Sequence, residues 1–227
     1  MSATVTREIN AVRAKPNIYS RYGKRAIDFV GSALGLLVLA PAFVLVAACI
    51  LLDSPGYIFF RQNRVGKNGR IFQIVKFRSM MVPAQPDPLG LPITVSGDHR
   101  VTSVGRILRK YKIDELPQLW NVFLGEMSLV GPRPELPVYV NRYTPEQRGV
   151  LGVRPGITDP ASLRYRNEEC LLAGSSEPER FYTETVLPDK LSINLQYIAR
   201  ISFVGDMVLL FATAKSAFNP SISNGAR

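Results

Sequence analysis

Histidine and cysteine, which supply many metal ligands and catalytic nucleophiles, are scarce in this sequence. The chain of 227 residues has one histidine, His99, and two cysteines, Cys49 and Cys170. A single histidine excludes any triad that needs a second one, and it excludes most zinc sites. One cysteine lies in an apolar run and the other lies in a distant polar segment, so neither a disulfide framework nor a thiolate metal site is indicated.

Negative charge is also in short supply. The chain carries 28 Lys and Arg against 18 Asp and Glu, which gives a formal net charge of +10. Such a balance indicates an anionic partner, which could be nucleic acid, a lipid surface or a phosphorylated small molecule. No stacked-aromatic or helix-turn-helix pattern supports nucleic-acid binding. The length is that of one substantial domain.

Charge is wholly absent from the segment between Asp28 and Asp53. A membrane-spanning helix needs about 20 apolar residues, so the run 29–52 is long enough to cross a bilayer. The run is too long for the core of a signal peptide, and no small-residue cleavage site follows it. We therefore expect a retained membrane segment.

Two features favour a re-entrant path for this segment over a single crossing. Pro41 lies near its middle, where it removes a backbone donor and predicts a kink. Basic residues flank the run on both sides, and positive charge stays on the cytoplasmic side of a membrane. These residues are Arg21, Lys24 and Arg25 before it and Arg61, Arg64, Lys67, Arg70 and Lys76 after it. A single crossing and a buried core helix remain the alternatives.

The rest of the chain predicts a small β-hairpin and several helices. Two alternating runs within 57–80 are joined by Lys67-Asn68-Gly69-Arg70, and an Asn-Gly pair is a strong hairpin signal. Prolines make 82–98 a loop. Helices are expected at about 102–111, from near Asp114, and over the C-terminal third. The apolar run 201–218 is short, so we expect it to pack or to lie at an interface.

These elements predict an α+β, mostly α fold: a re-entrant membrane helix-break-helix plus a compact cytosolic helical domain with a β-hairpin. The expected organisation is a weakly ordered N-terminal arm (1–20), the re-entrant membrane helix (21–53), the cytosolic domain (54–215) and a C-terminal tail (216–227).

Asp114 and Glu115 are adjacent acids in a basic chain. Consecutive helical residues point about 100° apart, so the two do not face each other across a sugar as a glycosidase pair does. Pro117 fits a first helical turn and places both acids at a helix N-terminus, which favours their ionised forms. One carboxylate could attack a phosphoryl group while its neighbour holds magnesium. The alternative is helix capping with surface salt bridges, each contributing about 0.2–1 kcal/mol.

Three motifs decide between these interpretations. "KFRSM" (76–80), "DELPQLWNVFLGEMSLVGPRP" (114–134) and "VRPGIT" (153–158) follow the apolar segment. Together they resemble the bacterial sugar transferases, the monotopic polyprenol-phosphate phosphoglycosyl transferases, over residues 20–212. By its length the chain resembles their minimal catalytic form.

The resemblance implies an activity and a location. The expected donor is a UDP-sugar and the expected acceptor is undecaprenyl phosphate. UMP would be released through a covalent aspartyl-phosphosugar intermediate. The expected place is the bacterial inner membrane, in contact with its lipids, with the catalytic domain on the cytoplasmic face. Nucleic acid is not an expected partner, and a homodimer is left open.

The family's roles can be assigned to positions of this chain. The resemblance implies that Asp114 is the nucleophile and that Glu115, together with Asp114, holds Mg²⁺. The cations assigned to substrate binding are Lys76, Arg78, Arg109, Arg133, Arg154 and Arg166.

The chain departs from the family pattern in two places. Asp159-Pro160 follows "VRPGIT" where many members have Gly-Leu, which leaves the assignment of Arg166 and the identity of the sugar open. Ala40-Pro41 stands where a Ser-Pro pair is frequent, although proline alone can still bend the helix.

Two other functions remain to be distinguished from phosphosugar transfer. A metal-dependent glycosyltransferase acting on a lipid acceptor would release UDP rather than UMP. A non-catalytic polybasic membrane-binding module would explain the clustered cations, but it would not explain an acidic pair near "GPRP".

Overall fold

The computed structural model describes residues 18–81 and 98–218 of the chain. Most of the predicted N-terminal arm, nearly all of the proline-rich loop and most of the C-terminal tail lie outside these residues. The described part is mostly helical, as predicted. Its helices are α2 (Lys24–Asp53), α3 (Ser103–Lys110), α4 (Gln118–Leu124), α5 (Pro137–Val140), α6 (Pro160–Arg164), α7 (Glu168–Ala173), α8 (Pro178–Phe181), α9 (Leu187–Ala199) and α10 (Phe203–Phe218).

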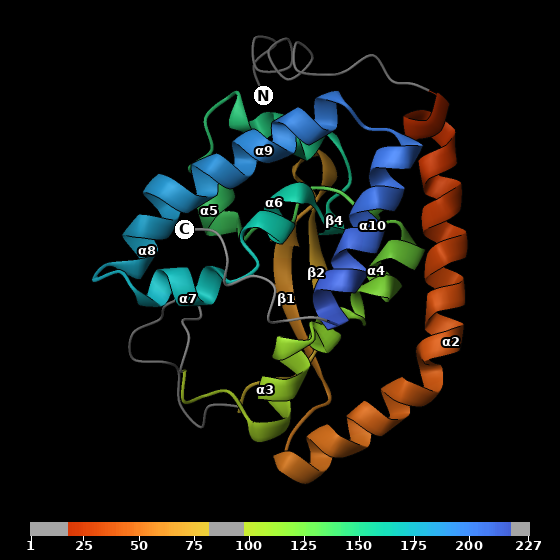
Figure 1. Cartoon of the computed structure of the whole chain (residues 1–227), viewed down its shortest axis with the longest axis vertical. Helices are drawn as coiled ribbons and strands as arrows, with labels where there is room; N and C mark the ends of the chain where they lie inside the picture. Colours follow the sequence, from red (N-terminus) through yellow and green to blue (C-terminus); the bar gives the residue numbers. More distant parts are fainter. Residues whose placement is uncertain (1–17, 82–97, 219–227) are drawn as a thin grey trace.

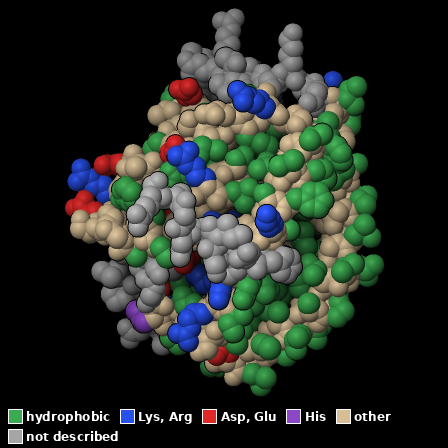
Figure 2. Space-filling view, viewed as in Figure 1, with side chains coloured by type: hydrophobic (Ala, Val, Ile, Leu, Met, Phe, Trp, Pro, Cys, Tyr) green, Lys and Arg blue, Asp and Glu red, His purple; other side chains and the backbone are tan. Residues whose placement is uncertain are grey.

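The apolar segment forms α2, which continues without interruption from a π-helical turn at Tyr19–Gly23. Among the described residues it is the one helix long and apolar enough to cross a membrane. Almost none of its apolar length is buried, which is not the packing of a core helix in a soluble protein. Figure 2 shows hydrophobic side chains gathered along α2 and over α10. They include Leu37, Val38, Val44, Leu45, Val204 and Phe211.

The predicted break in this segment is a bend within one continuous helix. Figure 1 shows α2 running along one side of the molecule and then turning under it. Pro41 lies inside the helix and cannot donate a hydrogen bond to the preceding turn, which is a common cause of bending.

Both ends of α2 are attached to the same body. Near its start, Arg25 donates to the carbonyl oxygens of Val122 and Phe123 at 2.7 and 2.9 Å. Buried Asp28 accepts from the Leu129 amide at 2.9 Å, one turn further along. At the other end, Ile50 is buried in a cluster with Phe77 and Leu108. The helix is therefore attached to the body at both ends, and between them Phe43 packs edge to face on Phe77 with ring centroids 5.2 Å apart.

The predicted hairpin is confirmed. Strands β1 (Phe59–Val65) and β2 (Ile71–Phe77) pair antiparallel, from Phe59 opposite Phe77 to Val65 opposite Ile71. Asn68 and Gly69 both have positive φ, 57° and 78°, as a type I′ turn requires at its two central positions. The hairpin carries Lys76 toward α4, because β2 packs against that helix.

A second pair of strands was not predicted from the sequence. Strands β3 (Ser128–Val130) and β4 (Gly156–Thr158) pair in parallel. The chain passes so closely here that a Cβ on Gly156 would lie 2.1 Å from the Gly131 nitrogen. Any residue other than glycine would clash, so this contact explains the glycine of "VRPGIT".

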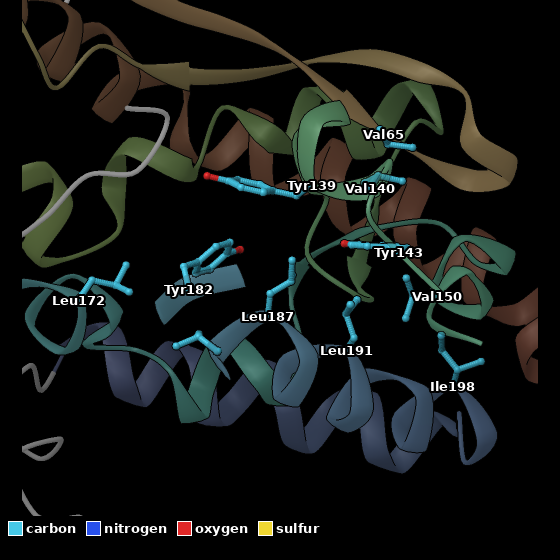
Figure 3. Packing of buried hydrophobic residues seen from close by; sticks show 11 residues of the cluster. Val65, Tyr139, Val140, Tyr143, Val150, Leu172, Tyr182, Leu187, Leu191 and Ile198 are labelled. Carbon is cyan, nitrogen blue, oxygen red and sulfur yellow. The ribbon is translucent and has the colours of Figure 1, made fainter. Parts of the chain in front are cut away.

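The main apolar core lies between α9 and the segment that contains α5. Figure 3 shows Tyr139, Tyr143 and Val150 facing Leu187 and Leu191. The aromatic rings of Tyr139 and Tyr182 pack edge to face with centroids 5.2 Å apart. This core supports the chain that follows β3, where "GPRP" lies.

Candidate active site

A tight turn after α3 places the two acids at the start of α4. Lys112 has a φ of 58°, an uncommon left-handed conformation for a residue other than glycine. The chain then forms a 3₁₀ turn at Ile113–Glu115, and α4 begins at Gln118. Asp114 and Glu115 are each only 8% exposed. Surface salt bridges therefore do not describe this pair.

Glu115 is held between two cations from different parts of the fold. Lys76 on β2 donates to its Oε1 at 2.9 Å. Arg133, just after β3, donates Nη1 to Oε2 at 2.9 Å and Nη2 to Oε1. Burial opposes ionisation of this carboxyl, but the charges of Arg133 and Lys76 outweigh it and hold the pKa of Glu115 well below its usual range. Glu115 is therefore an ionised carboxylate in a bidentate pair.

Asp114 is in the opposite electrostatic state. Its Oδ1 is buried and has no hydrogen-bond partner within the described structure. Burial, followed by the negative charge of Glu115, raises the pKa of Asp114, while Lys76 and Lys112 act against that rise. Adjacent acids whose environments push their pKa values apart are typical of sites that give them different tasks.

Arg109 also lies close enough to lower the pKa of Asp114. It projects from the last turn of α3, and its Nη2 donates to Oε1 of Glu169 on α7. The site thus brings together four of the predicted residues besides Glu115: Asp114, Lys76, Arg109 and Arg133.

Arg78, which was assigned to substrate binding, lies at the end of α2. It is 4% exposed, and its guanidinium donates to the carbonyl oxygens of Ser54 at 2.6 Å and Pro55 at 2.7 Å. Arg78 therefore closes the C-terminal end of α2, where unpaired carbonyls and the helix dipole favour a cation. Among the described contacts, the Arg78 guanidinium donates to these carbonyls and to neither Asp114 nor Glu115.

Arg154 and Arg166 are likewise engaged elsewhere. Arg154 donates from Nε to the Gly125 carbonyl at 2.9 Å, at the far end of α4 from the acids. Arg166 donates to the hydroxyl of Ser216 on α10. Among the described contacts, none links either arginine to Asp114 or Glu115.

Comparison with known families gives one match that covers most of the chain. The family model described as "Bacterial sugar transferase" matches residues 19–220, which is most of the chain. The chain belongs to the bacterial sugar transferase family.

Several curated bacterial proteins are similar to it along most of its length. The exopolysaccharide production protein PSS of Rhizobium leguminosarum bv. phaseoli is 38% identical over 85% of this chain and 94% of that protein. The UDP-glucose:undecaprenyl-phosphate glucose-1-phosphate transferase of Caulobacter vibrioides is 38% identical over 88% and 72%. The protein of the same name in Escherichia coli K12 is 35% identical over 88% of this chain but only 41% of its own length.

The structure explains the Asp159-Pro160 departure of this sugar transferase. Asp159 is fully buried and caps α6, accepting from the Ser162 amide at 3.0 Å and from its hydroxyl at 2.6 Å. Pro160 takes the first helical position, where no backbone donor is needed. Glu115 is the main cause of the raised pKa of Arg133, and the nearby Asp159 adds to it. This pair therefore begins a helix beside the site.

Sequence reasoning missed two features of this sugar transferase site. Gln118, one turn after the acids, is fully buried. Glu135, two residues after Arg133, is buried and accepts from the Tyr182 hydroxyl at 2.7 Å, with Arg64 and Lys190 each 3.7 Å away. Gln118 lies inside the motif 114–134 and Glu135 follows it directly, and this position was the one signal for both. The pattern of apolar residues along the chain does not indicate a role for either.

The residues present suit a magnesium ion that is shared with substrate. The described residues contain no cluster of three or more His, Cys, Asp or Glu side chains that could form an all-protein site. Magnesium is commonly held by one or two carboxylates together with substrate phosphates and water. Asp114 has an unpartnered oxygen, and Oε2 of Glu115 accepts one hydrogen bond from Arg133 and keeps a second lone pair, so the two carboxylates would supply that donor set.

Proposed function

We propose that this chain transfers a sugar 1-phosphate from a UDP-sugar to undecaprenyl phosphate and releases UMP. The observation that carries the proposal is the difference in hydrogen bonding between the two adjacent acids. Glu115 is neutralised by Lys76 and Arg133, whereas Asp114 keeps a carboxylate oxygen without a partner among those cations. Family membership supports it, as do the names of relatives that use UDP-glucose and undecaprenyl phosphate.

In the first step, an Asp114 carboxylate oxygen attacks the β-phosphorus of the donor. The bond from that phosphorus to the oxygen bridging the two phosphates breaks, and UMP leaves with the electron pair. The product on the enzyme is an acyl phosphate that carries the sugar. Arg109, Arg133 and Lys76 supply fixed positive charge near the oxygens where negative charge develops.

In the second step, a phosphate oxygen of undecaprenyl phosphate attacks the same phosphorus. The bond between phosphorus and Asp114 breaks, which restores the carboxylate and yields a polyprenol-diphosphate sugar. Donor and acceptor use the same cations in turn, as a ping-pong cycle requires.

Magnesium belongs to the same proposal, held by Asp114 and Glu115. When bound, it would neutralise charge on the phosphate oxygens. The chain's own residues hold the phosphates in line with Asp114, and the burial of the acidic pair limits the access of water.

The proposed location is the cytoplasmic face of the bacterial inner membrane, with α2 re-entering the leaflet. Support comes from α2 itself, because both of its ends are bonded to the same body while its middle exposes apolar side chains. A helix that crossed the bilayer once would have to hold its two ends on opposite sides.

The nucleotide released by purified protein tests the activity. The protein, magnesium and undecaprenyl phosphate would be incubated with UDP-glucose, UDP-galactose and UDP-N-acetylgalactosamine, for wild type and for Asp114→Asn. We expect wild type to release UMP with at least one donor and Asp114→Asn to release none. A melting curve would show that the variant is folded.

Two results would contradict the proposal. UDP as the released nucleotide would indicate transfer of the sugar without its phosphate. Full UMP release by Asp114→Asn would exclude Asp114 as the nucleophile. With donor and no acceptor, mass spectrometry of the peptide that contains Asp114 should show the added phosphosugar.

A further inference from the structure

Gln118 is a buried amide without a hydrogen bond. Its side chain is fully buried, and within the described structure neither Nε2 nor Oε1 has a partner. Most buried side-chain polar groups in native proteins are hydrogen-bonded, because an unsatisfied one loses its interactions with water and gains nothing in return. An amide left in this state indicates a ligand that satisfies it.

The position of Gln118 identifies that ligand's neighbours. It follows Asp114 by four residues and Glu115 by three, and the backbone between them is helical. The Leu119 amide donates to the Leu116 carbonyl at 3.0 Å, which continues the turn. Residues three and four apart on such a turn lie on one face. Gln118 therefore lies on the side of α4 that carries the acidic pair.

Asp114 shares the unsatisfied state. Its buried Oδ1 lacks a partner, and Gln118, one turn away, lacks one too, yet the two groups do not bond to each other. The Asp114 carboxylate oxygen and the Gln118 amide are thus two buried polar groups, one turn apart, that lack hydrogen-bond partners within the described structure. A ligand that contacts both would satisfy them together.

Asn121, the next side-chain amide along α4, has hydrogen bonds that indicate a structural role. Asn121 is equally buried, and its Oδ1 accepts from the Val75 amide at 3.0 Å. Its Nδ2 donates to the Gln73 carbonyl and to Glu126, each at 2.7 Å. Asn121 hydrogen-bonds α4 to β2, whereas the Gln118 side chain makes no hydrogen bond within the described structure. The contrast makes Asn121 a matched control.

We propose that Gln118 binds the phosphoryl group that Asp114 attacks, with Nε2 donating to a non-bridging phosphate oxygen. This inference rests on the proposed function and adds a substrate-contacting residue to it. The surrounding cations supply charge but little directionality, while an amide supplies a donor of fixed direction. The phosphoryl group can come from the donor diphosphate or from the acceptor monophosphate.

Binding and melting measurements on the full chain in detergent test the proposal without turnover. The variants are Gln118→Met and Asn121→Leu, and the probes are UDP and undecaprenyl phosphate, each with magnesium. We expect Gln118→Met to melt at or above the wild-type temperature, because it removes an unsatisfied amide. Asn121→Leu should melt lower. Gln118→Met should weaken binding of at least one probe about tenfold, as loss of a hydrogen bond to a charged group would.

The outcomes separate the two phosphate sources. Weakened UDP binding assigns Gln118 to the donor, and weakened undecaprenyl phosphate binding assigns it to the acceptor. The inference is overturned if both affinities are unchanged, or if Gln118→Met melts as low as Asn121→Leu or fails to fold. Loss of binding in Gln118→Met alongside active Asp114→Asn would refute the covalent mechanism and leave the phosphate contact in place.

Discussion

Among single residues, Lys76 affects both acids of the site at once. It donates to Glu115, and its charge also lowers the pKa of Asp114. Burial and the Glu115 charge leave the pKa of Asp114 above its ordinary value even so. In the proposed mechanism Asp114 must be ionised to attack phosphorus, so UMP release should fall as the pH drops through that raised pKa.

Replacing Lys76 by methionine removes a cation that favours the ionised form of Asp114. We therefore expect the acid limb of the pH profile for UMP release in Lys76→Met to move to higher pH, with a lower plateau. The profile would be recorded from about pH 5 to 8, where unperturbed carboxyls have already ionised. Arg70→Met, at the exposed turn of the same hairpin, is the control. An acid limb that does not move would mean that Asp114 is not the titrating group.

At the scale of secondary-structure elements, Arg78 joins the hairpin to the end of α2. Loss of its guanidinium leaves the carbonyls of Ser54 and Pro55 without their donor. We expect Arg78→Met to lower the free energy of unfolding by about 1.5–3 kcal/mol, the range for hydrogen bonds to a charged group. Denaturant melts would measure this. Arg61→Met, exposed on β1, should change stability by less than about 0.5 kcal/mol.

An Arg78→Met protein with wild-type stability and a large loss of substrate affinity would restore the phosphate-binding role that the motif predicts for this residue. Lowered stability with unchanged affinity would support the role that its contacts indicate.

Helix α7 bears on the site through Glu169, which pairs with Arg109. A phosphate that binds Arg109 must compete with this carboxylate. Removing the carboxylate charge in Glu169→Gln should therefore lower the Kd for UDP, by roughly two- to fivefold for a partly exposed pair. Calorimetry would measure the affinity, with Glu184→Gln on the exposed surface as the control. A higher Kd in Glu169→Gln would mean that Glu169 orients Arg109 rather than competing for it.

At the scale of the whole molecule, the re-entrant path proposed for α2 can be tested against a single crossing. Tyr22 and Leu52 lie near its two ends and are 64% and 88% exposed. Single cysteines at these positions, in a chain with Cys49 and Cys170 replaced by serine, would be probed with a membrane-impermeant maleimide. We expect both to react in inside-out vesicles and neither in intact spheroplasts. Reaction of one site from each side would establish a single crossing.

The sequence was informative where a local rule decides the structure. The Asn68-Gly69 turn fixes the hairpin through its backbone conformation, and the motif around Asp114 located the acidic pair. The β3–β4 pairing could not be predicted, because three-residue strands have no periodicity and meet through the glycine contact at Gly156. The contacts of Arg78 and the unsatisfied amide of Gln118 depend on chain segments that only the folded structure brings together.

The attachment of Asp28 has a consequence for the order of events during synthesis. Its carboxylate accepts from the Leu129 amide, 101 residues further along the chain. Ribosomes add about 5–20 residues per second, so roughly 5–20 s pass before that partner exists. During this interval a carboxyl at the edge of the apolar segment has neither of its later donors, the Leu129 amide and the Ser128 hydroxyl. The contacts that attach Asp28 to the body therefore cannot form until the motif that carries the acidic pair has been translated.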